Sequence, residues 1–241
     1  MLSHMSPYIA EFIGTYLLIT VGAAINANVV LAKTKGNNSG WIVISIGWGI
    51  AVFLGVYSAT SLGGSGHLNP AVSIGLSAFG GLDIELLGGY VVAQILGAFF
   101  GAITGWMAFI AHFRETTDPG AILAVFSTAP AIRNKPANFL TEAIGTFVLV
   151  LGALSASAPE SSLGALDALP VGLLVMGIGM GLGGPTGYAI NPARDLGPRI
   201  AHALLPIRNK GTSDWDYAWV PILGPIAGGI LGAGLHYLLI S

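Results

Sequence analysis

Long stretches without a charged residue constrain this chain more than any other feature. No Asp, Glu, Lys or Arg occurs between Glu11 and Lys33, and five further uncharged stretches follow. A helix that spans a bilayer needs about 20 apolar residues, and backbone inside lipid must satisfy its own hydrogen bonds. The pattern therefore predicts an all-α membrane protein with six spanning helices, at about residues 8–31, 41–61, 86–110, 138–158, 168–184 and 217–240.

Composition excludes several classes of protein. Only 8% of the residues are charged, against about 25% in soluble domains, so the chain cannot cover a water-facing surface. It has no cysteine, which excludes disulfides and thiolate chemistry, and no basic cluster that indicates nucleic acid as a partner. The first span lacks a preceding basic segment and a following cleavage site, so we interpret it as a retained helix rather than a signal peptide.

The chain repeats itself. Glu-x-Ile-Gly-Thr begins at Glu11 and again at Glu142, and Asn-Pro-Ala begins at Asn69 and again at Asn191. A Gly-x-x-x-Gly segment occurs in the third span (97–101) and in the sixth (224–228). The three motifs occur in the same order in both parts of the chain, which indicates two related halves. Each half has three spans, an odd number, so the second half enters the membrane inverted, which is a known plan of transport proteins.

We therefore expect one channel domain over residues 1–241. Its first repeat covers about 6–110 and its second about 137–241. The segment that joins them, about 111–136, contains three prolines and mixed charges, and is expected to be an exposed connector.

Each Asn-Pro-Ala segment predicts a short helix that begins inside the membrane. Asn is a preferred N-cap and Pro suits the first helical position. A helix over 70–79 is about 15 Å long, which is half the thickness of a bilayer core. The second copy predicts a similar helix from Pro192 to about His202. The residues expected at the midplane of a pore are Asn69, Pro70, Ala71, Asn191, Pro192 and Ala193.

The inversion makes these two helices enter from opposite faces, with their N-termini meeting near the centre of the membrane. Irregular backbone at that depth is tolerated only when it is buried in protein or lines a water-filled path. Each N-terminus carries about half a positive charge, so two facing N-termini form a barrier to cations and protons.

These motifs together resemble the aquaporin (major intrinsic protein) family over nearly the whole chain. The resemblance implies a right-handed bundle of six spanning helices and two half-helices, a homotetramer, and one pore in each subunit. Several positions resemble the glycerol-conducting (glycerol facilitator) branch. They are Asp195 directly after Arg194, Arg199 four residues later, and the pair Pro221-Ile222 in the last span.

The resemblance also implies a selectivity filter. Trp48, Tyr188 and Arg194 fall at three of its four positions. The fourth is Gly179 by ungapped counting from Asn191, or Met180 if a gap is placed; Gly leaves a wide filter and Met a narrow one. Arg194 supplies fixed N–H donors and a permanent charge, and Trp48 and Tyr188 offer an apolar wall to the carbon side of a polyol.

Three other polar residues lie in apolar surroundings. Glu11 and Glu142 must be paired or neutral when buried. They are expected to hold the glycine-rich loops through backbone N–H groups, and the alternative role is proton coupling. His67 is expected to line the pore or brace its loop, and the alternative role is a pH-sensitive gate.

The function predicted is a passive channel for small uncharged solutes. We expect glycerol, related polyols and water to pass, with urea, dihydroxyacetone and protonated lactic acid as further candidates, and ions and protons to be excluded. The alternative is a secondary transporter coupled to protons through Glu11 and Glu142. An enzyme is not expected, because no nucleophile–base pair, metal cluster or cofactor fingerprint occurs, and no cofactor or metal is predicted.

The chain is expected in the cell membrane of a prokaryote, as a multi-pass protein with both termini in the cytoplasm, as the resemblance implies. One pattern opposes this orientation. With both termini in the cytoplasm, all of the basic residues in the loops would lie outside the cell, whereas the positive-inside rule predicts that they lie inside. They are Lys33, Lys35, Arg114, Arg133, Lys135, Arg208 and Lys210.

Overall fold

The computed structural model describes residues 6–156 and 162–240. All of the regular elements in these residues are helices. Six of them are long and apolar enough to cross a membrane. They are α1 (Pro7–Val30), α2 (Trp41–Ser61), α4 (Ile84–Ala108), α7 (Lys135–Ala156), α8 (Ala168–Leu182, extended by the short η1, Gly164–Asp167) and α10 (Val220–Ile240). The six predicted spans are confirmed with small shifts at their ends, and residues 157–158 of the fourth lie outside the described residues.

The two half-helices are α3 (Pro70–Ala78) and α9 (Pro192–Leu204). Both begin at the proline of an Asn-Pro-Ala motif, as predicted. Each packs against the last long helix of the opposite half, because α3 contacts α10 and α9 contacts α4. The two halves are therefore interlocked, and neither contains the complete set of neighbours for its own half-helix.

Equivalent pairs of long helices form the two sides of the bundle. Helix α1 packs against α4, and α7 packs against α10, while α2 packs against α8. Large apolar side chains such as Ile42, Val92, Leu173 and Leu231 remain exposed on the outer faces. A bilayer covers such faces, because its acyl chains are as apolar as these side chains.

Glycines allow the α7–α10 and α1–α4 pairs to approach closely. A Cβ at Gly228 would lie 2.1 Å from the carbonyl oxygen of Ala143, and one at Gly97 would lie 2.4 Å from that of Phe12. No water is expelled when helices associate in lipid, so close van der Waals contact holds them together. The predicted Gly-x-x-x-Gly segments thus serve helix packing.

We expect Gly228→Ala to lower the free energy of unfolding by about 1–3 kcal/mol, because the methyl group must push α10 away from α7. Gly177→Ala is the matched control, since nothing lies within 4 Å of a Cβ at that helical glycine. Thermal unfolding in detergent, followed by tryptophan fluorescence, measures both. Equal midpoints for the two variants would contradict the packing role of Gly228.

The connector between the two halves is only partly exposed. Residues 110–126 form α5 (Ile110–Glu115) and α6 (Pro119–Phe126), and Phe113, Ile122 and Phe126 are buried. Helix α6 packs against α1 and α9. The cause is local: Asp118 Oδ1 accepts a hydrogen bond from the N–H of Gly120 at 2.8 Å, so Asp118-Pro119 caps a helix whose next six residues are apolar.

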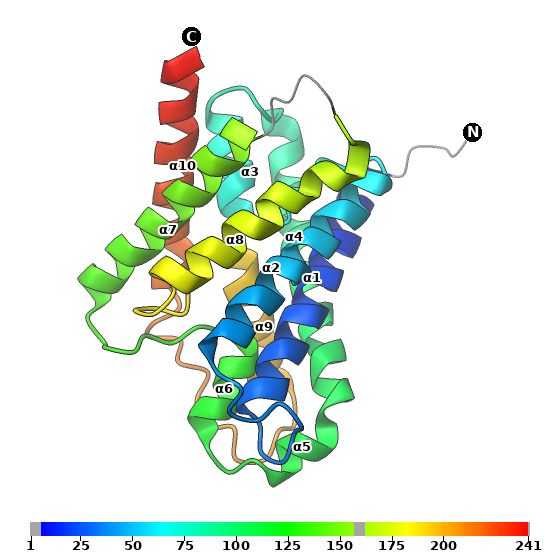
Figure 1. Ribbon diagram of the computed structural model, residues 1–241, viewed down its shortest axis with the longest axis vertical. Coiled ribbons are helices and arrows are strands. Elements are labelled where there is room, and N and C mark those ends of the chain that lie inside the picture. Colours follow the sequence, from blue (N-terminus) through cyan, green and yellow to red (C-terminus); the bar gives the residue numbers. More distant parts are fainter. Residues whose placement is uncertain (1–5, 157–161, 241) are drawn as a thin grey trace.

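Helices α5 and α6 lie at one end of the bundle, at the bottom of Figure 1, and the C-terminus lies at the opposite end. Several basic side chains of the loops have carboxylate partners: Lys33 binds Glu115, and Lys135 binds Asp216 at 2.6 Å. The hydrogen bond and charge of Lys135 hold the pKa of Asp216 below its ordinary value. The orientation implied by the resemblance stays a prediction.

Candidate functional site

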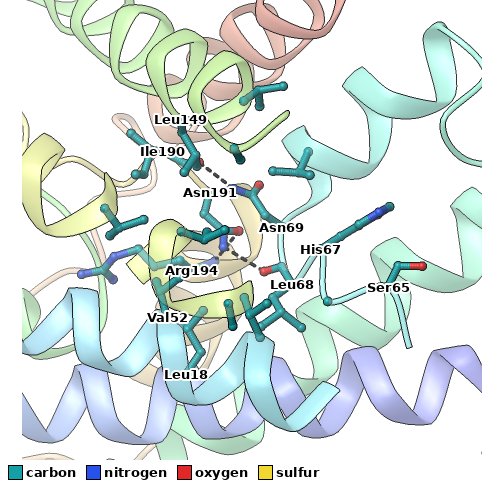
Figure 2. Close-up of a pocket in the computed structure, with 18 of the residues that line it drawn as sticks. Leu18, Val52, Ser65, His67, Leu68, Asn69, Leu149, Ile190, Asn191 and Arg194 are labelled. Carbon is teal, nitrogen blue, oxygen red and sulfur yellow. Dashed lines mark hydrogen bonds between the residues drawn. The ribbon is translucent and has the colours of Figure 1, made fainter. Parts of the chain in front are cut away.

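The N-termini of α3 and α9 meet inside the bundle (Figure 2). The side chain of Asn69 caps α3 by accepting from the N–H of Ala71, and the side chain of Asn191 caps α9 by accepting from those of Ala193 and Arg194. Pro70 and Pro192 occupy the first helical positions, where no N–H is needed. Both asparagines are buried, at 4% and 7% exposure.

The two asparagines also join the loops to each other. Asn69 Nδ2 donates to the carbonyl oxygen of Ile190 at 2.8 Å, and Asn191 Nδ2 donates to that of Leu68 at 2.9 Å. Because an amide nitrogen carries two hydrogens, each asparagine retains one N–H beyond this cross-link. The two partial positive charges at the helix N-termini therefore face the same small region.

The residues before the two asparagines have a strained backbone. Leu68 has φ +50° and Ile190 has φ +43°, a left-handed conformation that large side chains rarely adopt. Such strain costs about 1–3 kcal/mol per residue and persists only where neighbouring groups impose it. The two residues occupy equivalent places in the repeat, so the same distortion is built twice.

Glu11 and Glu142 hold these strained loops. Glu11 accepts from the N–H groups of His67 at 2.9 Å and Leu68 at 2.7 Å. Glu142 accepts from those of Ala189 at 3.0 Å and Ile190 at 2.7 Å. Each carboxylate uses both of its oxygens on backbone donors. This geometry is that of a loop brace on each side of the meeting point.

The first brace has an additional polar network that the sequence did not indicate. Gln94 on α4 donates to Glu11 Oε2 at 2.8 Å and to Ser73 Oγ at 3.0 Å. Ser73 Oγ in turn lies 3.1 Å from Nδ1 of His67. His67 is therefore tied to α3 through its ring as well as to α1 through its backbone. No motif marked Gln94, because its two partners, Glu11 and Ser73, lie on two other helices.

A cationic and aromatic constriction lies beside the asparagines. The guanidinium carbon of Arg194 lies 4.0 Å from the centroid of the Trp48 ring, a cation–π contact. Arg194 Nη1 donates to the carbonyl oxygen of Phe126 at 3.0 Å. Among the hydrogen bonds of the described residues, the other guanidinium N–H groups have no acceptor. Arg194 is 6% exposed and Trp48 is 5% exposed.

Of the two candidates for the fourth filter position, Gly179 lies beside Tyr188 and Met180 does not. The ring of Tyr188 occupies the space beside Gly179, where a Cβ would lie 2.7 Å from Cζ of that tyrosine. The carbonyl oxygen of Gly179 accepts from Nε1 of Trp41 at 2.8 Å. Met180, in contrast, is 46% exposed on the outer face. A side chain at position 179 would collide with Tyr188, so the two residues are matched.

A cavity of about 320 Å³ runs along these groups. Its lining begins at Trp48, Tyr188 and Arg194, passes both asparagines, and reaches Thr60, Ser65 and Asp167 at the other end. Most of its wall is aliphatic, formed by residues such as Leu18, Val52, Val56, Leu149 and Val175. His67 also lines it. The path is thus apolar on most sides, with polar groups along the two loops.

The residues that resemble the glycerol-conducting branch lie behind this cavity. Asp195 and Arg199 form a fully buried ion pair, with 2.7 Å between Oδ1 and Nε. Asp195 accepts from the N–H and hydroxyl of Thr128, and Arg199 donates to the carbonyl of Thr128. This pair therefore fixes the end of α6 close to Arg194. Pro221 and Ile222 lie in the first turn of α10 and are not part of the cavity lining.

No group of three or more His, Asp or Glu side chains that could hold a metal ion occurs within residues 6–156 and 162–240. The arrangement offers hydrogen-bond donors, a fixed positive charge and apolar walls along a narrow path. These features suit the passage of a neutral solute that carries both hydroxyl and carbon surfaces.

Comparison with known proteins agrees with this architecture. The family model described as major intrinsic protein matches residues 2–237. A probable glycerol uptake facilitator protein of Thermotoga maritima is 57% identical over 232 residues, which cover 96% of this chain and 98% of that protein. Glycerol uptake facilitator protein 3 of Lactiplantibacillus plantarum is 51% identical, over 96% of this chain and 95% of that protein.

Among solved structures, the X-ray structure of the aquaglyceroporin from Plasmodium falciparum superposes with a TM-score of 0.87. It is 31% identical in sequence, and the match covers 99% of this chain and 98% of that one. With its six apolar helices and bacterial relatives, the chain is a multi-pass bacterial membrane protein. On its sequence and its fold, the chain belongs to the major intrinsic protein family.

Proposed function

We propose that this protein is a passive channel that conducts glycerol and related small polyols, together with water, and excludes ions and protons. The observation that carries the proposal is the constriction itself. Arg194 packs on the face of Trp48, and both line one cavity together with Tyr188. Its remaining guanidinium N–H groups have no acceptor among the described residues and can donate to a solute. The names of the relatives, glycerol uptake facilitators, support the same solute.

The chemistry of glycerol matches these two walls. Its hydroxyl groups can accept from Arg194 and, deeper in the path, from the free N–H of Asn69 or Asn191. Its carbon atoms can lie against the aromatic rings and the aliphatic wall. A solute that loses its water shell needs such replacements for its hydrogen bonds, because an unpaired polar group in an apolar site is costly. Glycerol, water and similar neutral molecules satisfy this condition.

Ions meet two barriers on the same path. Arg194 presents a permanent positive charge at the constriction, and the N-termini of α3 and α9 add partial positive charges at the asparagines. No carboxylate lines the cavity between Arg194 and the two asparagines. A cation or hydrated proton would therefore lose its hydration near positive charge, which is the basis of exclusion.

Proton-coupled transport is disfavoured by the positions of Glu11 and Glu142. Both carboxylates accept hydrogen bonds from backbone N–H groups of the loops, and neither lines the cavity. A proton on either one would displace a donor that holds a strained residue. As a member of this family the chain is a passive channel and not an enzyme.

The proposal extends to urea, dihydroxyacetone and protonated lactic acid as further permeants, which are small and neutral like glycerol. It also includes a homotetramer, which the resemblance implies. The cavity and its constriction are formed within one chain, so each subunit would conduct independently.

Stopped-flow light scattering on proteoliposomes tests the proposal. Glycerol, urea and lactic acid are each mixed with vesicles at two pH values, with empty liposomes as the control. We expect rapid glycerol influx that only equilibrates the gradient, does not saturate and is unchanged between the two pH values. Glycerol influx equal to that of empty liposomes would overturn the solute assignment, and accumulation against a gradient would overturn passive conduction.

A further inference from the structure

The side chain of Trp48 rests on two residues of α1 that do not line the cavity. Gly22 lies under the six-membered part of the indole, where a Cβ would be 2.4 Å from Cη2 and 2.5 Å from Cζ3. Asn26, one helical turn later, accepts from Trp48 Nε1 through its Oδ1 at 2.9 Å. We propose that Gly22 and Asn26 form a seat for Trp48 that sets the width and the polarity of the constriction. This inference rests on the proposed function.

Gly22 contributes by the absence of a side chain. Carbon atoms in contact prefer separations of about 3.5–4.0 Å, so a methyl group at position 22 would require the indole to move by about 1 Å. Backbone of α1 lies on one side of the ring and Arg194 lies 4.0 Å from its other face. The displaced ring would therefore press on Arg194, which already contacts it, and both side chains would have to shift within the cavity that they line.

Asn26 contributes by satisfying the indole N–H. Its amide accepts from Trp48 and donates to the carbonyl oxygen of Ala124 on α6 at 2.7 Å. With its N–H occupied, Trp48 presents only an apolar surface to the solute, and Arg194 remains the donor. The same amide ties Trp48 to α6, which carries the Phe126 carbonyl that holds Arg194. Asn26 is thus a positioning residue for both walls.

The test compares Gly22→Ala and Asn26→Leu with two control variants. Gly177→Ala adds a methyl group at an open position. Asn28→Leu removes an amide from α1 that lies beside Gly36 and not beside Trp48. The readout is the ratio of glycerol permeability to water permeability in proteoliposomes. We expect Gly22→Ala to lower this ratio about tenfold, because a shift of about 1 Å is large in a narrow pore.

Asn26→Leu is expected to change the ratio of glycerol to water permeability about threefold. A factor of this size corresponds to roughly the net free energy of one hydrogen bond. Ultraviolet resonance Raman spectroscopy gives a reading that does not depend on transport. The band that reports indole N–H hydrogen bonding, isolated by subtraction of the Trp48→Phe spectrum, should shift in Asn26→Leu and stay in place in Asn28→Leu. If Gly22→Ala fails to assemble, the Asn26→Leu measurements decide the matter alone.

A double-mutant cycle separates the seat from a general structural effect. Phenylalanine lacks the N–H and the outer ring atoms that meet Gly22, so both α1 changes should lose their effect in a Trp48→Phe background. Unchanged ratios in the single variants, or equal changes in both backgrounds, would overturn the seat. A wild-type protein that conducts no glycerol would overturn the proposed function instead, while the Raman shift would still test the contact between Asn26 and Trp48.

Discussion

Glu142→Ala is expected to destabilise the protein more than any surface substitution in it. The change removes the acceptor of two buried backbone N–H groups, at Ala189 and Ile190. Each unsatisfied buried donor costs about 1–3 kcal/mol, so the free energy of unfolding should fall by about 2–6 kcal/mol. The strained φ of Ile190 would then lack the contact that maintains it, and glycerol conduction should fall with the loss of fold.

Urea unfolding in detergent, followed by tryptophan fluorescence, measures this effect. Glu85→Ala is the matched control, because Glu85 is an exposed carboxylate in the first turn of α4. Glu142→Gln retains one acceptor oxygen and should lie between the wild type and Glu142→Ala. If Glu142→Ala and Glu85→Ala unfold at the same urea concentration, Glu142 does not brace the loop.

The second large effect is expected for Arg194→Ala, which should let cations through. Two like charges about 4 Å apart repel by about 4 kcal/mol at an effective dielectric constant near 20, which corresponds to a factor of roughly 10³ in rate. The helix N-termini at Asn69 and Asn191 remain and retain part of the barrier. We therefore expect proton and sodium flux to rise about 10²-fold, with weaker discrimination between glycerol and urea.

A pH-sensitive dye inside proteoliposomes, with an imposed potential, measures the proton flux. Arg208→Ala removes an exposed arginine at the end of the bundle and serves as the control. Arg194→Lys keeps the charge but loses the planar fork of donors, so it should still exclude cations while its solute selectivity changes. Wild-type ion exclusion in Arg194→Ala would show that this arginine is not the charge barrier.

Much of the fold could be predicted from the sequence, because lipid imposes strict rules on composition and length. The uncharged stretches predicted six spans, which are confirmed. The two Asn-Pro motifs predicted where the half-helices begin, since a capping side chain and a proline act on their own next few residues. Such local signals are read directly from a single chain.

Contacts between distant segments could not be predicted in the same way. Asn26 meets Ala124 across 98 residues, and Arg194 meets Phe126 across 68. No hydrophobic periodicity or sequence motif connects such pairs. The sequence around a buried amide on an apolar helix does not indicate which distant group it binds. The buried α6 was missed for a related reason: three prolines between 119 and 136 outweighed the apolar run that follows Asp118.

The choice between Gly179 and Met180 shows the same limit. The two residues are neighbours on α8, and a helix turns by about 100° per residue, so a shift of one position changes which side chain faces inward. Counting along the sequence left both open. Packing favours Gly179 as the filter position, because Tyr188 fills the space beside Gly179 and Met180 is exposed on the outside.

Chemical blockade of the cavity tests the central idea most directly, namely that solute passes between the two half-helices. The natural chain has no cysteine, so a single thiol can be placed without background. Val52 lines the cavity, whereas Leu54 on the same helix is exposed on the outside. After complete labelling with a membrane-permeant maleimide, verified by mass spectrometry, Val52→Cys should lose glycerol conduction and Leu54→Cys should keep it. Full conduction through labelled Val52→Cys would mean that glycerol takes another route.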